Sequence, residues 1–264
     1  MFFKTRDHIR LSYDFSGTGL VVVLLPGINE NRQIWFKQLI FLKQHHFRVL
    51  TLDFRNQGES QRTYRGQRVF QLAADLQELL DYLKITKIFL VGHSMGAAVS
   101  FAYLALYGSV NLLGIIDVDQ SPKMINDQTW HYGLKNLTWE SFPELLKLPL
   151  PSPTWHGIEA DIKEKITEVK KNNSTNSSAN QALLIDNAFQ DWRDVIVESK
   201  CPIYFITGAY SPYFDCNFAP AITAIAPMTD YINILNAGHL VMAEQSAVFN
   251  QALLKGLTWI SDQR

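Results

Sequence analysis

The stretch Gly92-His93-Ser94-Met95-Gly96 decides how the rest of this chain is interpreted. It has the form G-x-S-x-G, in which a serine stands on a sharp turn between a strand and a helix. Residues 87–91 have the composition of a short buried strand, and the apolar residues 95–107 that of a buried helix. The glycines allow strand and helix to approach closely while the serine projects above the sheet. The motif therefore predicts that Ser94 is a nucleophile.

Short β-branched runs alternate with longer amphipathic segments on both sides of this motif, which is typical of βα units around a parallel sheet. The strand-like runs are 21–25, 47–54, 87–91, 112–118, 203–207 and 231–235, and residues 2–5 and 8–15 resemble a hairpin at the sheet edge. The helical segments are 31–44, 69–83, 95–107, 218–225 and 240–260. We expect an α/β fold with a mostly parallel, eight-stranded sheet flanked by helices.

The alternation stops between residues 122 and 198, where three prolines cluster at Pro149, Pro151 and Pro153. Apolar residues on one helical face over 158–169, and a second amphipathic stretch over 182–195, predict helices there. We expect residues 122–198 to form a helical cap inserted into a core made of residues 1–121 and 199–264. The polar residues 172–180 between these stretches predict a mobile loop.

Composition excludes several classes of protein. With 47% apolar and 19% charged residues, the 264-residue chain can bury a core. Its net charge of -1 argues against a nucleic-acid partner. The two cysteines are too few for a disulfide framework. Charges interrupt the first fifteen residues, so these residues lack the apolar stretch of a signal peptide. No apolar run approaches the roughly 18 residues of a spanning helix. We expect a soluble cytoplasmic protein that does not engage a membrane, either a monomer or a homodimer.

A serine hydroxyl needs a base to take its proton, and the chain has seven histidines. His239 follows the last strand-like run and the turn Asn236-Ala237-Gly238, which puts it at the carboxyl edge of the sheet, where α/β active sites form. His93 lies inside the motif and points away from the site if Ser94 points toward it. His239 is therefore the predicted base.

These motifs resemble those of the α/β-hydrolase superfamily, and the resemblance covers nearly the whole chain. Leu25-Pro26-Gly27-Ile28 looks like the family's oxyanion loop, with Pro26 where histidine is usual. The resemblance implies that the backbone N–H groups of Ile28 and Met95 form the oxyanion hole. The segment 53–60 is similar to the family's D-x-R-G-x-G-x-S segment, with Asn56 at the first glycine position, and we interpret it as structural.

The third member of the triad departs from the family's commonest pattern. Gly208-Ala209-Tyr210-Ser211 has a serine where many members carry the acid. A branch that includes bacterial acyl esterases carries its acid after the strand that follows the nucleophile helix, in a D-x-S-P context similar to Asp119-Gln120-Ser121-Pro122. We prefer Asp119 as the acid, with Asp215 and then Asp117 as alternatives.

The resulting hypothesis is a serine carboxylic ester hydrolase that acts on a small-molecule ester or thioester substrate without cofactor or metal. Perhydrolysis or a lyase step on the same triad, and a ligand-sensing regulatory protein, stay open as alternatives. Four of the six tryptophans fall in residues 122–198, namely Trp130, Trp139, Trp155 and Trp192. They predict either an aromatic lining for an apolar substrate pocket or packing of the cap onto the core.

Overall fold

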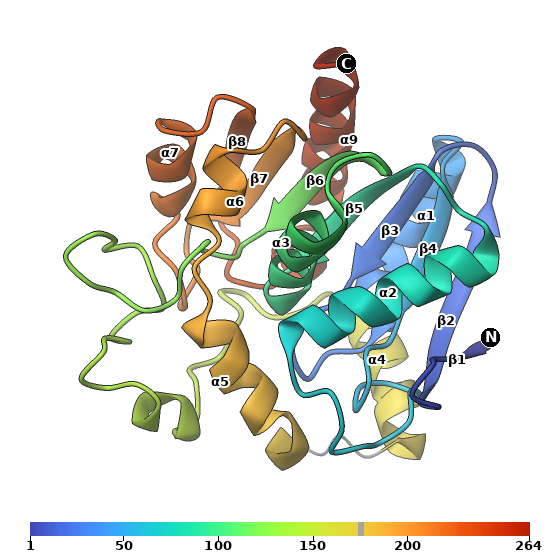
Figure 1. The fold of residues 1–264 in the computed structure, drawn as a ribbon, viewed down its shortest axis with the longest axis horizontal. Coiled ribbons are helices and arrows are strands. Elements are labelled where there is room, and N and C mark those ends of the chain that lie inside the picture. Colours follow the sequence, from blue (N-terminus) through green and yellow to red (C-terminus); the bar gives the residue numbers. More distant parts are fainter. Residues whose placement is uncertain (174–176) are drawn as a thin grey trace.

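The computed structural model describes residues 1–173 and 177–264, and in these residues eight strands form one sheet between two layers of helices (Figure 1). The strands are β1 (Phe2–Lys4), β2 (Arg10–Gly17), β3 (Val21–Leu25), β4 (Arg48–Leu52), β5 (Ile88–His93), β6 (Leu112–Val118), β7 (Ile203–Gly208) and β8 (Thr229–Ile234). Their order is β1-β2-β4-β3-β5-β6-β7-β8. The pairs β1–β2 and β2–β4 are antiparallel, and the other five pairs are parallel. The predicted fold class is confirmed.

Alternate residues of the central strand β3 belong to two separate cores. Val21, Val23 and Leu25 belong to a core that includes residues of α2 and α3, whereas Val22 and Leu24 belong to a core on the other face that includes residues of α1 and α9. None of these five side chains is more than 9% exposed. Burying an aliphatic side chain of this size contributes about 1.5–3 kcal/mol, so the sheet is stabilised from both faces.

The helices around the sheet begin and end close to the expected positions, but two are divided. They are η1 (Arg32–Trp35), α1 (Phe36–Gln44), α2 (Val69–Leu83), α3 (Met95–Tyr107), α7 (Phe218–Thr223), α8 (Val241–Glu244) and α9 (Ser246–Asp262). The segment 31–44 starts as a 3-10 helix. The expected helix 240–260 is interrupted at Gln245, and the Ser246 N–H donates to Glu159 Oε1 at 2.9 Å, so the side chain of Glu159 caps a new helix.

Residues 122–198, which we call the insertion, lie between β6 and β7 beside the ends of the strands (Figure 1). Their helices are η2 (Glu144–Lys147), α4 (Ala160–Asn172), η3 (Ser177–Asn180), α5 (Gln181–Phe189) and α6 (Arg193–Val197). The predicted amphipathic stretch 182–195 forms two helices, α5 and α6, which are separated where Asp191 pairs with Lys123 as an isolated bridge. Part of the predicted loop 172–180 is helical instead, and its residues 174–176 lie outside the described residues.

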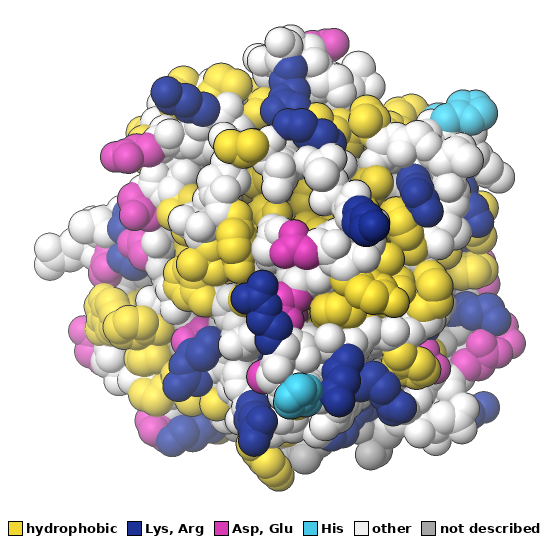
Figure 2. Space-filling model, turned by 45° about the vertical axis from the view of Figure 1, so that its right-hand side comes forward, with side chains coloured by type: hydrophobic (Ala, Val, Ile, Leu, Met, Phe, Trp, Pro, Cys, Tyr) yellow, Lys and Arg dark blue, Asp and Glu magenta, His cyan; other side chains and the backbone are white. Residues whose placement is uncertain are grey.

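The surface shows no segregation of charge on the face drawn in Figure 2, where basic and acidic side chains are both spread between apolar patches. Among the described helices, none combines the length and apolar character needed to cross a bilayer. Parallel α/β sheets bind their ligands in the loops at the carboxyl ends of the strands, so the functional site is expected there.

Candidate active site

Ser94 stands on the turn between β5 and α3, as the motif predicts. Its backbone has φ 51° and ψ -124°, a left-handed conformation that is costly for a residue with a side chain. A Cβ at Gly92 would lie 2.3 Å from the carbonyl carbon of Gly96, and one at Gly96 would lie 2.4 Å from the Leu25 carbonyl oxygen. Only glycine fits both positions, and this close approach holds Ser94 at the edge of the sheet.

The structure brings His239 and Asp119 together from the ends of two different strands. His239 follows β8 and Asp119 follows β6, and Nδ1 of His239 lies 2.7 Å from Oδ2 of Asp119. Both side chains are buried. Burial, together with the charge of the neighbouring His93, lowers the pKa of His239, although Asp119 acts in the opposite direction. His239 is thus held as a neutral imidazole with its tautomer fixed by Asp119.

Ser211 occupies the position expected for the acid and supports Asp119 instead. Its Oγ donates a hydrogen bond to Oδ2 of Asp119 at 2.7 Å, while the Gly208 N–H donates to Oδ1 at 3.0 Å. The carboxylate of Asp119 therefore accepts hydrogen bonds from His239, Ser211 and the end of β7. In the sequence, Ser211 is conspicuous only because it replaces the usual acid. A hydroxyl at that position is also a donor that can satisfy a carboxylate.

The two alternative acids do not contact His239. Asp117 lies in β6 and is buried, with Oδ1 accepting the Gln120 N–H at 2.9 Å and Oδ2 without a partner among the described residues. Burial raises the pKa of Asp117 well above its ordinary value, which favours the neutral form of this side chain. Asp215 is exposed and accepts hydrogen bonds from the Asn217 backbone and side chain.

The backbone N–H groups of Ile28 and Met95 have no hydrogen-bond acceptor among the described residues. Ile28 lies in the loop after β3, and Met95 is the first residue of α3. Met95 is fully buried, and the start of a helix concentrates unpaired N–H groups and positive potential. Two unused donors beside Ser94 are suited to stabilise a developing negative charge.

His93 is fully buried and has partners on both ring nitrogens. Nδ1 lies 3.0 Å from Oε1 of Glu30, and Nε2 lies 3.0 Å from the backbone oxygen of His239. Burial opposes a charge on either group, yet their mutual attraction outweighs it, so the pKa of Glu30 is lowered and that of His93 is raised. The prediction that His93 points away from the site holds, but nothing in the sequence indicated Glu30.

Ser94, His239 and Ile28 line one cavity of about 670 Å³. The insertion supplies much of the apolar wall of this cavity, including Met124, Leu134, Leu146, Leu148, Ile158, Ile166 and Leu184. The insertion is tied to the loop that carries His239, because the His239 N–H donates to the Pro153 oxygen at 2.8 Å. No hydrogen bond joins Ser94 Oγ to His239 within the described residues, although both side chains face the same space.

The four tryptophans of the insertion are absent from the cavity wall as far as the described residues go. Trp130 and Trp192 are buried in the core, and Trp139 and Trp155 are about half exposed. Trp192, for example, packs its ring against Phe70 of α2 at 5.5 Å. The hypothesis of an aromatic lining from these residues is wrong. Trp130 and Trp192 instead fit the alternative interpretation, in which the tryptophans pack the insertion onto the core.

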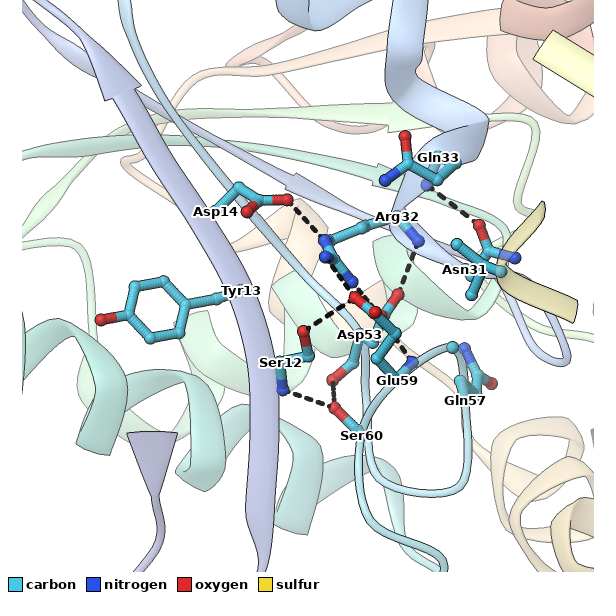
Figure 3. Close-up of polar contacts among 12 residues, drawn as sticks. Ser12, Tyr13, Asp14, Asn31, Arg32, Gln33, Asp53, Gln57, Glu59 and Ser60 are labelled. Carbon is cyan, nitrogen blue, oxygen red and sulfur yellow. Dashed lines mark hydrogen bonds and ion pairs between the residues drawn. The ribbon is translucent and has the colours of Figure 1, made fainter. Parts of the chain in front are cut away.

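The segment 53–60 contributes Asp53 and Glu59 to an ion-pair group around the buried Arg32, which we call the Arg32 cluster: Arg32, Asp14, Asp53 and Glu59 (Figure 3). Nε of Arg32 contacts Asp14 at 2.6 Å, Nη2 contacts Glu59 at 2.6 Å, and Nη1 pairs with Asp53. Asp53 also accepts the backbone N–H groups of Arg32 and Glu59 at 2.7 and 3.0 Å. These contacts join β2, η1 and the loop that follows β4, so the cluster stabilises the fold.

No group of three or more His, Cys, Asp or Glu side chains in the described part of the chain could hold a metal ion.

Comparison with known proteins places these features in a family. The sequence model described as alpha/beta hydrolase fold matches residues 21–246. The chain is 29% identical to an sn-1-specific diacylglycerol lipase, ABHD11, of Xenopus laevis over 91% of this chain and 80% of that protein. It is 21% identical to the AB hydrolase superfamily protein YisY of Bacillus subtilis over 96% and 97% of the two chains.

Solved structures show the same fold. An esterase from Exiguobacterium antarcticum superposes with a TM-score of 0.84 at 20% identity over 97% of this chain and 98% of the other. A bromoperoxidase from Bacillus anthracis gives 0.83 at 20% identity over 96% and 97%. With the family model spanning most of the sequence and the fold shared along its length, this chain belongs to the α/β-hydrolase family.

Proposed function

We propose that this protein is a serine hydrolase that cleaves small to medium carboxylic esters or thioesters through an acyl-enzyme. The observation that carries the proposal is the buried hydrogen bond between His239 and Asp119 beside the strained turn of Ser94, with all three at the carboxyl edge of one sheet. This is the arrangement of nucleophile, base and orienting acid that recurs in acyl-transfer enzymes.

In the proposed mechanism, Ser94 Oγ attacks the carbonyl carbon while Nε2 of His239 takes the serine proton. His239 then gives that proton to the leaving alcohol or thiol, and water repeats the sequence to release the acid. The lowered pKa of His239, caused by burial and by the charge of His93, keeps the ring unprotonated near neutral pH and able to act as a base. Asp119 holds the tautomer that leaves Nε2 free.

The N–H groups of Ile28 and Met95 hold the oxyanion in this proposal. Their lack of acceptors among the described residues supports the assignment, because unused donors cost no rearrangement when charge develops on the substrate. Each such donor is typically worth about 10² to 10³ in rate. They act with Ser94 at the point where the oxyanion loop meets the start of α3.

The cavity supports a substrate with an apolar part of moderate size. Its volume of about 670 Å³ is in the range of small-molecule pockets, and aliphatic side chains of the insertion make up much of its wall. Acyl or alkyl groups of several carbons fit this description better than highly charged substrates do. We expect p-nitrophenyl esters to show a chain-length optimum.

A fluorophosphonate probe tests the nucleophile directly, since it forms a stable bond only with an activated serine. We expect the native protein and Ser152→Ala, which changes an exposed serine of the insertion, to be labelled equally, and Ser94→Ala to be unlabelled and inactive toward p-nitrophenyl esters. Folded native protein that resists labelling, or labelling that survives Ser94→Ala, would contradict the proposal.

A further inference from the structure

A second histidine–carboxylate pair lies directly against the first. The rings of His93 and His239 are 4.5 Å apart between centroids, and Nε2 of His93 lies 3.0 Å from the carbonyl oxygen of His239. His93 ends β5 immediately before Ser94, whereas His239 lies in the loop after β8. This one contact therefore joins the turn of the nucleophile to the loop of the base.

Glu30 extends the connection to the oxyanion loop. Its Oε1 lies 3.0 Å from Nδ1 of His93, and its Oε2 accepts the Gly27 N–H at 2.6 Å. Gly27 directly precedes Ile28, whose N–H we assign to the oxyanion hole. A Cβ on Gly27 would lie 3.0 Å from Nδ1 of His93, so the loop and the histidine are closely packed. One carboxylate thus holds the loop that must present Ile28.

The hydrogen-bond partners of His93 favour a protonated ring. A backbone carbonyl and an ionised carboxylate only accept hydrogen bonds, so with Glu30 ionised, as its lowered pKa favours, both ring nitrogens of His93 carry a proton. His93 is then a buried imidazolium paired with Glu30, which agrees with the raised pKa of His93 that results when the attraction of Glu30 outweighs burial. A full positive charge next to the His239 ring opposes protonation of that ring.

We propose that Glu30 and His93 are positioning residues that lock the oxyanion loop, the Ser94 turn and the His239 loop together and keep His239 unprotonated. The inference rests on the proposed function, in which His239 is the base. The charged or titratable groups that face His239 are Asp119, His93, Glu30 and Tyr213, whose ring lies 4.6 Å from that of His239. Of these, only His93 contributes a positive charge.

The test is Glu30→Gln, because glutamine has nearly the same shape but leaves His93 without a carboxylate. We expect kcat/KM per fluorophosphonate-titrated site to fall about 10-fold or more, as for the loss of a hydrogen bond to a charged group. The acidic limb of the kcat/KM profile should move to higher pH, because His93 loses its charge and His239 becomes easier to protonate. Glu30→Asp should recover part of both effects.

Glu244→Gln is the matched control. Glu244 also holds the loop of His239, since its Oε1 accepts the Gly238 N–H at 3.0 Å, but its hydrogen bonds among the described residues go to backbone N–H groups and not to the His239 ring or to His93. A merely structural role predicts that both variants lose activity equally at every pH. We expect Glu244→Gln to leave the acidic limb in place, so an unmoved limb in Glu30→Gln overturns the proposal.

Histidine NMR titration gives a readout that does not depend on turnover. The signal of His93 should titrate at higher pH than that of an exposed histidine in the native protein, and at lower pH in Glu30→Gln. If Glu30→Gln does not fold, His93→Gln removes the same charge while its amide can still donate to the His239 carbonyl, and the His239 signal should move to higher pH. A native protein without esterase activity would defeat the proposed function, whereas unchanged histidine titrations would defeat this inference.

Discussion

The Arg32 cluster and the Asp119–His239 pair both contain a buried carboxylate just after a strand, Asp53 and Asp119, but they differ in what is left unpaired. In the Arg32 cluster, all three guanidinium nitrogens face carboxylates, and Asp53 is further held by two backbone N–H groups (Figure 3). Around His239, the ring Nε2 and the N–H groups of Ile28 and Met95 have no partner among the described residues. A closed network stabilises a fold, whereas an open one can bind a reacting group.

The largest effect should come from the open network, in Asp119→Asn. An amide in place of the carboxylate can no longer favour the tautomer with a proton on Nδ1, and comparable changes in serine hydrolases lower kcat about 10⁴-fold. We expect that loss in p-nitrophenyl ester turnover, with the unfolding midpoint in urea little changed.

The alternative acids supply the controls for this prediction. Asp117→Asn and Asp215→Asn should each keep kcat within a few-fold of the native value, because neither side chain contacts His239. A loss in either variant as large as that in Asp119→Asn would reassign the triad acid.

Breaking the closed network should cost stability. Arg32→Met removes the cation but leaves Asp53 buried, and an uncompensated buried charge typically costs about 3–5 kcal/mol of unfolding free energy. Urea unfolding followed by tryptophan fluorescence measures the change, and the fraction that stays folded should still be labelled at Ser94. The double variant Arg32→Met with Asp53→Asn should be less destabilised than Arg32→Met alone. Equal losses in both would mean that the cluster acts by packing rather than by charge.

Ser211→Ala should have a smaller effect than Asp119→Asn, because it removes one of three hydrogen bonds to the Asp119 carboxylate. A hydrogen bond to a charged group contributes about 1.5–3 kcal/mol, so kcat/KM should fall about 10- to 100-fold. Thr207→Val, which removes a hydroxyl that bonds Asn233 on the neighbouring strand, is the control and should change kcat/KM much less. Native activity in Ser211→Ala would show that Asp119 needs no such support.

The sequence was most informative where chemistry and backbone geometry are local. The turn of Ser94 requires glycines at fixed spacing, and the strands require apolar runs, so both are visible in a single chain. Contacts between distant loops are different. Asp119 and Ser211 are 92 positions apart, and His93 and Glu30 are 63 apart, and only the strand order brings them together.

The insertion was harder to predict than the core, because its sequence lacks the regular alternation of strand-like and helical segments that marks the core. Its helices are broken where a tertiary contact intervenes, as at the Lys123–Asp191 bridge between α5 and α6. Its tryptophans also show why residue type alone did not reveal the pocket lining, since a buried indole packs equally well into a core. Trp192 packs against Phe70, and aliphatic side chains of the insertion line the cavity instead.

The smallest effect should be seen at Asp117. This residue lies in β6, two positions before Asp119, and one of its carboxyl oxygens has no partner among the described residues. Burial raises the pKa of this carboxyl well above its ordinary value of 3.8. The unfolded chain therefore releases the proton at lower pH than the folded protein does, and stability falls as pH rises from about 4 toward the folded-state pKa.

Asp117→Asn cannot ionise, and its amide oxygen can still accept the Gln120 N–H, so it escapes this loss. The unfolding free energy of Asp117→Asn minus that of the native protein should increase as pH rises above about 4 and level off once pH passes the folded-state pKa, in urea titrations at each pH. The exposed Asp215→Asn serves as the reference for a carboxyl change outside the core. If the difference for Asp117→Asn stayed constant with pH, the carboxyl would have to be ionised in the folded state, and a second buried charge would lie two residues before Asp119. That result would make the open network larger than the Asp119–His239 pair.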